Sequence, residues 1–382
     1  MFYKGNYFIH GWHGNLNAGD DAFAAVMSLF LRRYCHAEKI VMESDISGYL
    51  HRNYNIDLIQ NHIYIPGMSR IRRKYFSKSC TNFILAGGSL FTQEYVESLL
   101  ESPILNSRKV IALGVSVSPF TSSFHENQVV ALLNKMTYVA FRDQYSFDWA
   151  LSKNIKCDFV NAFDLAVLMP LLKPIEIKLK VTKKNIGISL LGFHFLRDQS
   201  TLEDDLYFFR KLALATAQVA RKYEASITVY SLCRHTIFND DIVCEAFIKA
   251  LPDDIESKLV QHTGDPYITL SSMNQSTHIV SVRLHGSIFS YINQTPTLMF
   301  DYHPKCRAFA NLVGLPEKFV LKTIDFDLDH YSSALGDLLE TQHPSFSMPL
   351  SDAQSLALKN FSGYIPWSAK YSLQNSDLAS FL

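Results

Sequence analysis

The chain has 382 residues, of which 48% are hydrophobic and 19% are charged. This is enough apolar material for two packed domains, and it excludes a disordered or fibrous chain. Lysine and arginine number 36, as do aspartate and glutamate, so the formal net charge is zero. That balance argues against general binding to nucleic acid or an anionic membrane, but it leaves room for a local basic site that binds a small anion.

The six cysteines lie far apart and include no Cys-x-x-Cys pair, which excludes a zinc ribbon and a thioredoxin-type motif. Scattered cysteines in a long chain are typical of reduced thiols. The N-terminal stretch shows no signal-peptide pattern, and the longest apolar run, residues 163–172, is about half of what spans a bilayer. We therefore predict a cytoplasmic protein without a spanning helix, and we leave open peripheral contact with the inner face of the cytoplasmic membrane.

Short apolar runs alternate with helical patterns through the first half of the chain, an order typical of β-α-β units on a parallel sheet. In the first helical pattern Phe23, Val26 and Phe30 recur at helical spacing, so that one face is apolar. The expected strands are residues 7–10, 40–43, 82–86, 110–113 and 138–141, and the expected helices are residues 21–35, 94–101, 126–135 and 145–152.

Composition changes at residues 169–184, where two prolines and five lysines predict a linker. The alternation then resumes, with a long helix at 202–223 capped by Ser200 or Thr201. The other expected elements are strands at 186–190, 227–231, 279–282 and 297–300 and helices at 240–250 and 287–293. We predict an α/β protein with two Rossmann-like, doubly wound domains facing across a cleft, residues 1–175 and 176–350, followed by a C-terminal helix and tail at 351–382.

A glycine-rich stretch at residues 11–21 joins the first strand to the first helix. Glycines let a ligand approach the backbone, and free N–H groups at a helix start attract anions or hydroxyls. Asn17 and Asp20 have the chemistry to bond sugar hydroxyls, although Asp20 as a simple helix cap explains the pattern equally well. The stretch is not Gly-x-Gly-x-x-Gly and no P-loop lysine follows, which disfavours dinucleotide and nucleoside triphosphate sites.

Two further strand ends carry candidate groups. Gly87 and Gly88 follow the strand at 82–86, and their backbone amides suit a phosphate or carboxylate; the alternative is an ordinary tight turn. Arg142 comes directly after the strand at 138–141, so we expect it to point into the crevice, where its planar fork suits an oxyanion. The alternative for Arg142 is a local ion pair with Asp143.

The strongest signal is the pair Arg283 and His285, where an apolar strand meets a helix. Their alternate spacing places both side chains on one side of an extended segment, which sets a cation for an oxyanion beside a titratable proton donor. Gly286 and Ser287 would then offer amides at the helix start, and Arg234 adds a cation after the strand at 227–231. The alternative is that His285 has a purely structural role, with its ring nitrogens hydrogen-bonded within the protein. No metal-ligand spacing and no Gly-x-Ser-x-Gly sequence is present.

Together these motifs resemble the polysaccharide pyruvyl transferase family. The matching elements, in the family's order, are residues 17–21, 86–91 and 114–119, Arg142 and Asp143 with Ser146, residues 164–166 and 283–285, and Pro296, Tyr302 and Lys305. The resemblance covers roughly residues 9–305. It implies a two-domain fold like that of the B-type glycosyltransferases, and a transferase that moves pyruvate from phosphoenolpyruvate onto sugar hydroxyls as a cyclic ketal, releasing phosphate.

The resemblance implies the roles of the candidate residues. His285 is the expected catalytic residue, which protonates the methylene carbon of phosphoenolpyruvate. The expected donor-binding residues are Arg283, Arg142, Arg234, Gly286 and Ser287, and the expected acceptor-binding residues are Asn17, Asp20, Gly87 and Gly88. No cofactor and no metal is required. The expected partners are phosphoenolpyruvate and a saccharide or lipid-linked glycan, not nucleic acid.

Two other functions stay open at this point. One is a nucleotide-sugar-dependent glycosyltransferase with the same two-lobed architecture, which would use the same cations for a diphosphate. The other is a non-catalytic protein that binds an anionic glycan through Arg283 and His285.

Overall fold

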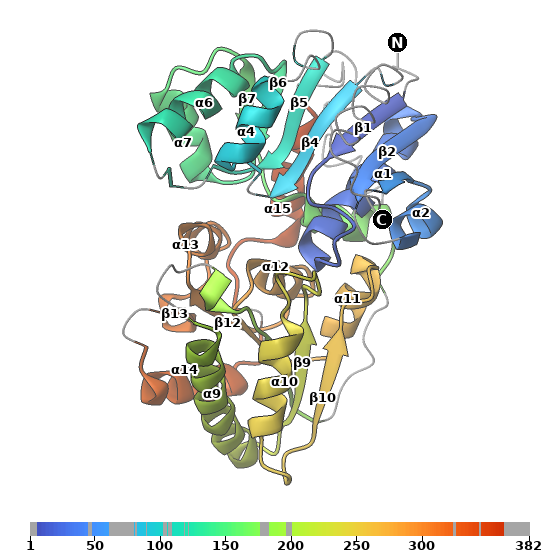
Figure 1. Ribbon diagram of the computed structural model, residues 1–382. Coiled ribbons are helices and arrows are strands. Elements are labelled where there is room, and N and C mark those ends of the chain that lie inside the picture. Colours follow the sequence, from blue (N-terminus) through green and yellow to red (C-terminus); the bar gives the residue numbers. More distant parts are fainter. Residues whose placement is uncertain are drawn as a thin grey trace. The chain divides into compact units, whose positions relative to one another are not determined.

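The computed structural model describes residues 6–44, 48–60, 80, 82–88, 90–101, 105, 109–117, 119–120, 122–175, 183–195, 201–323, 326–343 and 345–362. The chain divides into two compact units, each built around one parallel sheet (Figure 1). The first unit comprises Met1–Asn15, Asp20–Pro174 and Ser351–Leu382, and the second comprises Leu16–Gly19 and Ile175–Leu350. The described parts of both units are α/β structures, which confirms the predicted fold class at the level of the individual unit.

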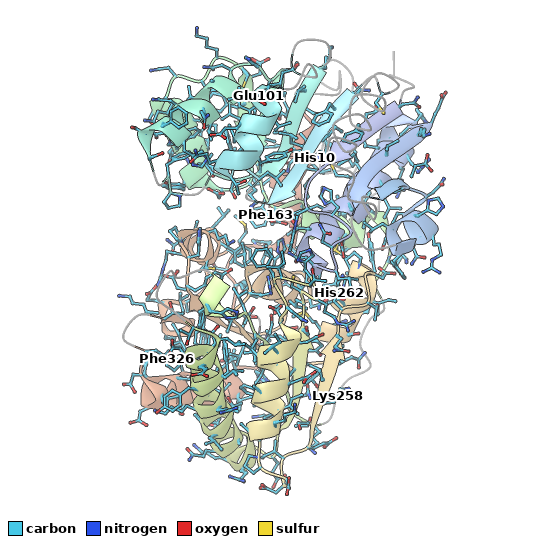
Figure 2. The ribbon with its side chains drawn as sticks, in the orientation of Figure 1. His10, Glu101, Phe163, Lys258, His262 and Phe326 are labelled. Atoms are coloured by element: carbon cyan, nitrogen blue, oxygen red, sulfur yellow. The ribbon has the colours of Figure 1, made fainter. Side chains whose placement is uncertain are left out.

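The sheet of the first unit has seven parallel strands in the order β3-β2-β1-β4-β5-β6-β7. They are β1 (Asn6–His10), β2 (Lys39–Ser44), β3 (Asp57–Gln60), β4 (Asn82–Gly88), β5 (Lys109–Val115), β6 (Tyr138–Phe141) and β7 (Asp158–Asn161). His10 at the end of β1 (Figure 2) pairs in register with Leu85 of β4, and its ring stacks on that of Tyr95 with the ring centroids 4.9 Å apart. Because chain order reverses between β1 and β4, their carboxyl ends form the topological switch point, where ligands bind in such sheets.

The helices of the first unit follow from local capping and an apolar face. Asp143 caps one of them by accepting a bond from the N–H of Ser146 at 2.8 Å, and Ser122 caps another at the N–H of His125. The described helices are α1 (Ala18–Cys35), α2 (Gly48–Tyr54), α4 (Gln93–Leu100), α6 (Ser123–Leu133), α7 (Gln144–Ser152), α8 (Met169–Leu172) and α15 (Leu350–Leu358), with 3-10 turns η1 (Leu165–Leu168) and η4 (Lys359–Phe361).

The C-terminal segment differs from the expected separate helix and tail, because its described part packs into the first unit (Figure 1). Asn360 is fully buried, and its side chain accepts a bond from the N–H of Gly114 at 2.6 Å and donates to the carbonyl of Phe163 at 2.9 Å. The ring of Phe361 stacks on that of Phe30 with centroids 3.6 Å apart. The remainder of the expected tail, residues 363–382, lies outside the described residues.

We expect Asn360→Ala to lower the free energy of unfolding of the first unit by about 2–6 kcal/mol. The change leaves the buried N–H of Gly114 and the carbonyl of Phe163 without their bonds to Asn360, and each such orphan costs about 1–3 kcal/mol. Denaturant unfolding measures the loss. The control is Ser355→Ala, an exposed position on α15 whose hydroxyl bonds only within the helix. Equal effects in the two variants would contradict the role of Asn360.

The sheet of the second unit has six parallel strands in the order β10-β9-β8-β11-β12-β13. They are β8 (Asn185–Ser189), β9 (Ser226–Ser231), β10 (Ser257–Gln261), β11 (His278–Ser281), β12 (Thr297–Asp301) and β13 (Val320–Lys322). Lys258 and His262 mark β10 and its carboxyl end in Figure 2. Chain order reverses between β8 and β11, so the switch point lies at their carboxyl ends.

The helices of the second unit begin with α9, which Thr201 caps in a capping box with Asp204, as one of the two expected caps. They are α9 (Leu202–Lys222), α10 (Asp241–Ala250), α11 (Pro266–Met273), α12 (Leu284–Ile292), α13 (Pro304–Leu312) and α14 (Leu328–Glu340), with 3-10 turns η2 (Phe193–Phe195) and η3 (Glu317–Phe319). None of the helices in the described part of the chain is both long and apolar enough to cross a membrane.

The start of the expected linker is helical, as α8. Met169, the first residue of α8, is fully buried, and the chain passes from the first unit to the second between Pro174 and Ile175. The proline at position 170 fits the first turn of a helix, where its missing N–H costs nothing, so it does not mark a break. Residues 176–182 of the expected linker lie outside the described residues.

Candidate active site

The strand-to-helix junction of the second unit places Arg283 and His285 differently from the sequence expectation. Strand β11 ends at Ser281 and α12 begins at Leu284, three residues before the expected helix start. Arg283 is extended and occupies the cap position, whereas His285 lies in the first helical turn. The two side chains are therefore neighbours at a helix start, and alternation along a strand, from which we inferred a common side, does not apply.

The early start of α12 also corrects the roles expected of the Gly286 and Ser287 amides. Both N–H groups bond to the carbonyl of Arg283, at 3.0 and 3.3 Å, so the helix itself uses them. The unpaired amides of a helix are those of its first turn, which here begins at Leu284. Gly286 has a packing role, because a Cβ atom on it would lie 2.4 Å from the hydroxyl oxygen of Ser281.

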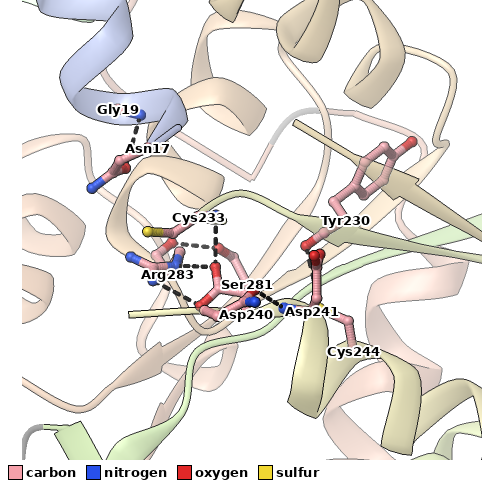
Figure 3. Close-up of polar contacts among 10 residues, drawn as sticks. Asn17, Gly19, Tyr230, Cys233, Asp240, Asp241, Cys244, Ser281 and Arg283 are labelled. Carbon is pink, nitrogen blue, oxygen red and sulfur yellow. Dashed lines mark hydrogen bonds and ion pairs between the residues drawn. The ribbon is translucent and has the colours of Figure 1, made fainter. Parts of the chain in front are cut away.

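Arg283 is held by a buried carboxylate rather than left open. Its Nε bonds to one oxygen of Asp240 and its Nη2 bonds to the other at 2.7 Å (Figure 3). Asp240 is fully buried and also accepts the N–H of Cys233 at 2.9 Å. Burial opposes the charge on Arg283, but the attraction of Asp240 outweighs it and raises the pKa of the guanidinium. Within the described residues Nη1 has no hydrogen bond, so that side of the fork remains for a ligand.

Arg234 is likewise paired, with the next carboxylate along the chain. Its Nε lies 3.0 Å from an oxygen of Asp241, and Nη1 donates to the carbonyl of His262 at 3.4 Å. The side chain is 32% exposed, against 15% for Arg283. Arg234 is thus the more solvated of the two, and its part in donor binding stays a prediction.

His285 rests against a short segment that the second unit takes from the start of the chain. Asn17 forms a bridge with Cys233, and the N–H of Ala18 bonds to the carbonyl of Leu232 at 2.8 Å. A Cβ atom on Gly19 would lie only 2.0 Å from Nδ1 of His285. The imidazole therefore packs directly on the backbone of Gly19, which only a glycine permits.

The cap of α1 is Asn17, not Asp20. Helix α1 begins at Ala18, and the side-chain oxygen of Asn17 accepts the N–H of Gly19 at 3.2 Å (Figure 3). The alternative interpretation of Asp20 as the helix cap is therefore wrong. The side-chain oxygen of Asn17 thus accepts a hydrogen bond at the helix start. The expected contact of Asn17 with an acceptor stays a prediction.

The switch point of the first unit brings Asp20 beside Gly88. A carboxylate oxygen of Asp20 lies 3.2 Å from the position that a Cβ atom on Gly88 would take, and Asp20 is 8% exposed. Gly87 and Gly88 adopt φ values of 73° and 76°, which favour glycine. A side chain on Gly87 would overlap the ring of Phe23. Three of the four predicted acceptor residues therefore lie at this switch point.

Arg142 is buried in the first unit instead of pointing into an open crevice. Its Nη1 lies 2.9 Å from an oxygen of Asp164, and Nη2 donates to the hydroxyl of Ser116 at 3.3 Å. The local alternative is also wrong, because Asp143 caps α7. Asp164 reaches Arg142 because it caps η1 directly after β7, the neighbour of β6 in the sheet. The pair with Asp164 holds the guanidinium in place, and the part of Arg142 in donor binding stays a prediction.

His13, a fully buried residue in the loop after β1, is not among the residues predicted from the sequence. Its Nδ1 donates to the carbonyl of Asp20 at 2.9 Å. Burial lowers the pKa of His13 from 6.5 to about 4, although the bond to Asp20 and the charge of Asp21 oppose that shift. His13 is therefore neutral at pH 7, and the histidine inside the glycine-rich stretch was the only sequence signal of it.

The low pKa of His13 predicts a loss of stability in acid. Between about pH 6.5 and pH 4 the unfolded chain binds a proton that the folded chain does not, so stability falls as the pH falls through this window. Complete acidification should cost about 3.5 kcal/mol, from roughly 1.4 kcal/mol per pKa unit. Urea unfolding at a series of pH values should show a shallower acid loss in His13→Gln than in the wild type, and parallel curves would contradict the assignment.

The described residues form no recognisable metal-binding cluster. Among the residues that the structure describes, no group of three or more His, Cys, Asp or Glu side chains is arranged to hold an ion.

A comparison with protein families identifies the family of this chain. The family model described as "Polysaccharide pyruvyl transferase" matches residues 17–304, which is most of the chain. This chain belongs to the polysaccharide pyruvyl transferase family. The match includes the segment Leu16–Gly19 from Asn17 onward and ends at the start of α13, so it contains all ten donor, acceptor and catalytic residues predicted from the sequence. Comparison with curated proteins finds no significant match.

Solved structures show which fold this chain shares. They include a putative UDP-N-acetylglucosamine 2-epimerase from Listeria monocytogenes (TM-score 0.65, 10% identity, 94% of this chain and 96% of that one). Another is MnaA of S. aureus with UDP (TM-score 0.63, 11% identity, 94% and 98%). A third is HepE of Anabaena with UDP and glucose (TM-score 0.57, 12% identity, 99% and 100%). At such low identity the likeness concerns the fold alone, and it confirms the two-domain Rossmann-like architecture.

Proposed function

We propose that this protein moves pyruvate from phosphoenolpyruvate onto two hydroxyls of a saccharide or lipid-linked glycan as a cyclic ketal, and releases phosphate. Membership of the family supports a transferase that acts on polysaccharide. The observation that carries the donor assignment is the junction of β11 and α12, which places a charged, partly exposed Arg283, held by the buried Asp240, next to His285. The reaction would take place in the cytoplasm, where phosphoenolpyruvate is made, and needs no cofactor or metal.

The junction suits a small dianion. Phosphoenolpyruvate carries a carboxylate and a phosphate, and the open side of Arg283 together with the first amide of α12 meets one of them with charge and with N–H donors. Asp240 holds the guanidinium in one orientation, so little entropy is lost when the ligand binds. Arg234 supplies a second, more solvated cation in the same unit.

The proposed reaction balances as two additions and one elimination. Protonated His285 gives its proton to the methylene carbon, and the double-bond electrons form the new C–H bond. The cation left at the central carbon is attacked by the first sugar hydroxyl, whose proton returns to His285. The bond from carbon to the phosphate oxygen then breaks, and the second hydroxyl closes the ketal while its proton leaves with the phosphate. A bound anion beside the ring favours the protonated imidazole that the first step needs.

The decisive experiment incubates the protein with phosphoenolpyruvate and a panel of simple and lipid-linked glycosides. Phosphate release and a product heavier by pyruvic acid minus water are the expected results. Tight glycan binding with no phosphate released from any member would instead favour a non-catalytic glycan-binding protein.

We expect Arg283→Lys to raise the half-saturating concentration of phosphoenolpyruvate by about 10- to 150-fold, the usual worth of a charged hydrogen bond of 1.5–3 kcal/mol. One ammonium group cannot hold Asp240 and a ligand anion together. Steady-state kinetics measures the change, after thermal unfolding has shown that the variant folds. The control is Arg221→Lys, which alters another two-point pair of the second unit, that with Asp254, and should leave donor saturation unchanged. Unchanged donor saturation in Arg283→Lys would show that Arg283 is structural.

A second candidate is a nucleotide-sugar-dependent glycosyltransferase. The observation that favours it is the shared fold with proteins whose structures contain UDP. The same arginines would then meet a diphosphate. A rise in melting temperature with UDP, together with no phosphate release from phosphoenolpyruvate, would select this function over the first.

A further inference from the structure

Two buried hydrogen-bond acceptors in the loop after β1 lack donors. They are Nε2 of His13 and the side-chain oxygen of Asn15, in side chains that are 0% and 4% exposed. Neither atom has a hydrogen-bond partner within the described residues. Buried polar atoms in folded proteins are almost always paired, so each of these two requires an explanation.

The bonding of each side chain fixes it as an acceptor. A carbonyl only accepts, so the contact with Asp20 places the proton of neutral His13 on Nδ1 and leaves a lone pair on Nε2. The amide nitrogen of Asn15 donates to the carbonyl of Trp12 at 3.3 Å, which identifies its other atom as the oxygen. Of the titratable groups around His13, Asp21 raises the pKa of the imidazole and His10 lowers it.

The loop is held rigidly at the switch point of the first sheet. A Cβ atom on Gly11 would lie 2.4 Å from Nε2 of His13 and 2.6 Å from the carbonyl oxygen of Ala86 on β4. Nε2 is therefore close to the ends of both β1 and β4. The N–H of Gly14 bonds to the carboxylate of Asp21 at 2.7 Å, which ties the loop to α1. Acceptors fixed in this way are preorganised for a ligand that supplies donors.

We propose that His13 and Asn15 form a hydroxyl subsite, in which each accepts a hydrogen bond from a hydroxyl of the acceptor saccharide. The proposal rests on the proposed function and specifies its acceptor side. Lone pairs repel an anion, so phosphoenolpyruvate is excluded from this subsite, whereas the hydroxyl pair required for a ketal supplies the two missing donors. Because the hydroxyl hydrogens point toward His13 and Asn15, the lone pairs of the sugar oxygens point away from the loop. His13 and Asn15 are thus binding residues that select a saccharide with free hydroxyls.

The test uses two substitutions that separate the nitrogens of His13. In His13→Asn the amide N–H can still reach the carbonyl of Asp20, but the acceptor at Nε2 is gone; His13→Gln retains an atom near Nε2. We expect His13→Asn to raise the KM for a methyl glycoside that serves as acceptor by about 10- to 100-fold, with the KM for phosphoenolpyruvate unchanged. His13→Gln should recover part of the loss. The control is His51→Asn, which alters another first-unit histidine whose Nδ1 bonds to a carbonyl, that of Ile56 at 2.8 Å.

A second measurement does not depend on transfer. In protein labelled with 15N-histidine, the Nε2 resonance of His13 should move when methyl glucoside, galactoside or mannoside is added without phosphoenolpyruvate. The O-methylated form of the responding glycoside should leave it in place. Transfer to a glycoside without a response of Nε2, or equal KM changes for both substrates in His13→Asn, would overturn the subsite. A response of Nε2 without any phosphate release would support the subsite and refute the pyruvyl transfer.

Discussion

The His285→Gln variant is expected to bind phosphoenolpyruvate nearly as well as the wild type and to turn it over about 100- to 10,000-fold more slowly, the usual share of general acid–base catalysis. The glutamine amide can still hydrogen-bond the donor, but it has no proton to give to the methylene carbon. The residue is only partly buried at the start of α12, so its replacement leaves no core cavity.

Calorimetry of phosphoenolpyruvate binding and turnover with a saturating acceptor would be compared on the same His285→Gln protein. Near-native turnover would remove His285 from the chemistry. Loss of the folded state would favour a structural histidine. Weak binding with full turnover at saturation would make His285 a donor ligand and would leave another group, such as Tyr302 or His303, to supply the proton.

The second large effect is expected from Gly19→Ala, which should reduce turnover by about 100-fold or more while both units stay folded. The new methyl group would lie 2.0 Å from Nδ1 of His285, a distance that forces the ring or the first turn of α1 to move. A displacement of about 1 Å in a reacting group is enough to cost two orders of magnitude in rate. Turnover at saturating substrate is the measurement, because the loss should fall on kcat.

Gly336→Ala is the matched control for Gly19→Ala. Gly336 lies in α14, and a Cβ atom there would meet Tyr223 at an ordinary contact distance of 3.5 Å. Alanine is the better helix former by about 1 kcal/mol, so this variant should be active and slightly more stable. Full activity in Gly19→Ala would show that His285 does not need its observed position.

The central strands of both sheets were predictable from the sequence, because they are buried on both faces and read as apolar runs. The outer strands β3, β7, β10 and β13 were missed. In β10 the sequence Ser-Lys-Leu-Val-Gln is half exposed and has no continuous apolar run, so pairing with β9 decides its conformation. Propensity alone is a weak signal in such strands, since tertiary context determines them.

The candidate site was predictable in its residue types but not in its pairings. Arg283 and His285 stood out because charged residues at the end of an apolar strand are unusual. Their partners did not, because Asp240 is 43 residues from Arg283, and Gly19 is contributed by the other end of the chain. Arg142 illustrates the same point: Asp143 was the obvious partner by sequence, and Asp164 is the actual one.

The segment Leu16–Gly19 has a practical consequence for dissecting this protein. A fragment expressed from Ile175 onward would contain Arg283, Asp240 and His285, but it would lack the strand bridge at Cys233 and the glycine that supports the imidazole. A chimera joined at the apparent domain boundary would likewise combine His285 with a foreign copy of that segment. Domain exchange between relatives should therefore carry these four residues together with the C-terminal half, so that a functional second lobe is assembled from two separate stretches of the gene.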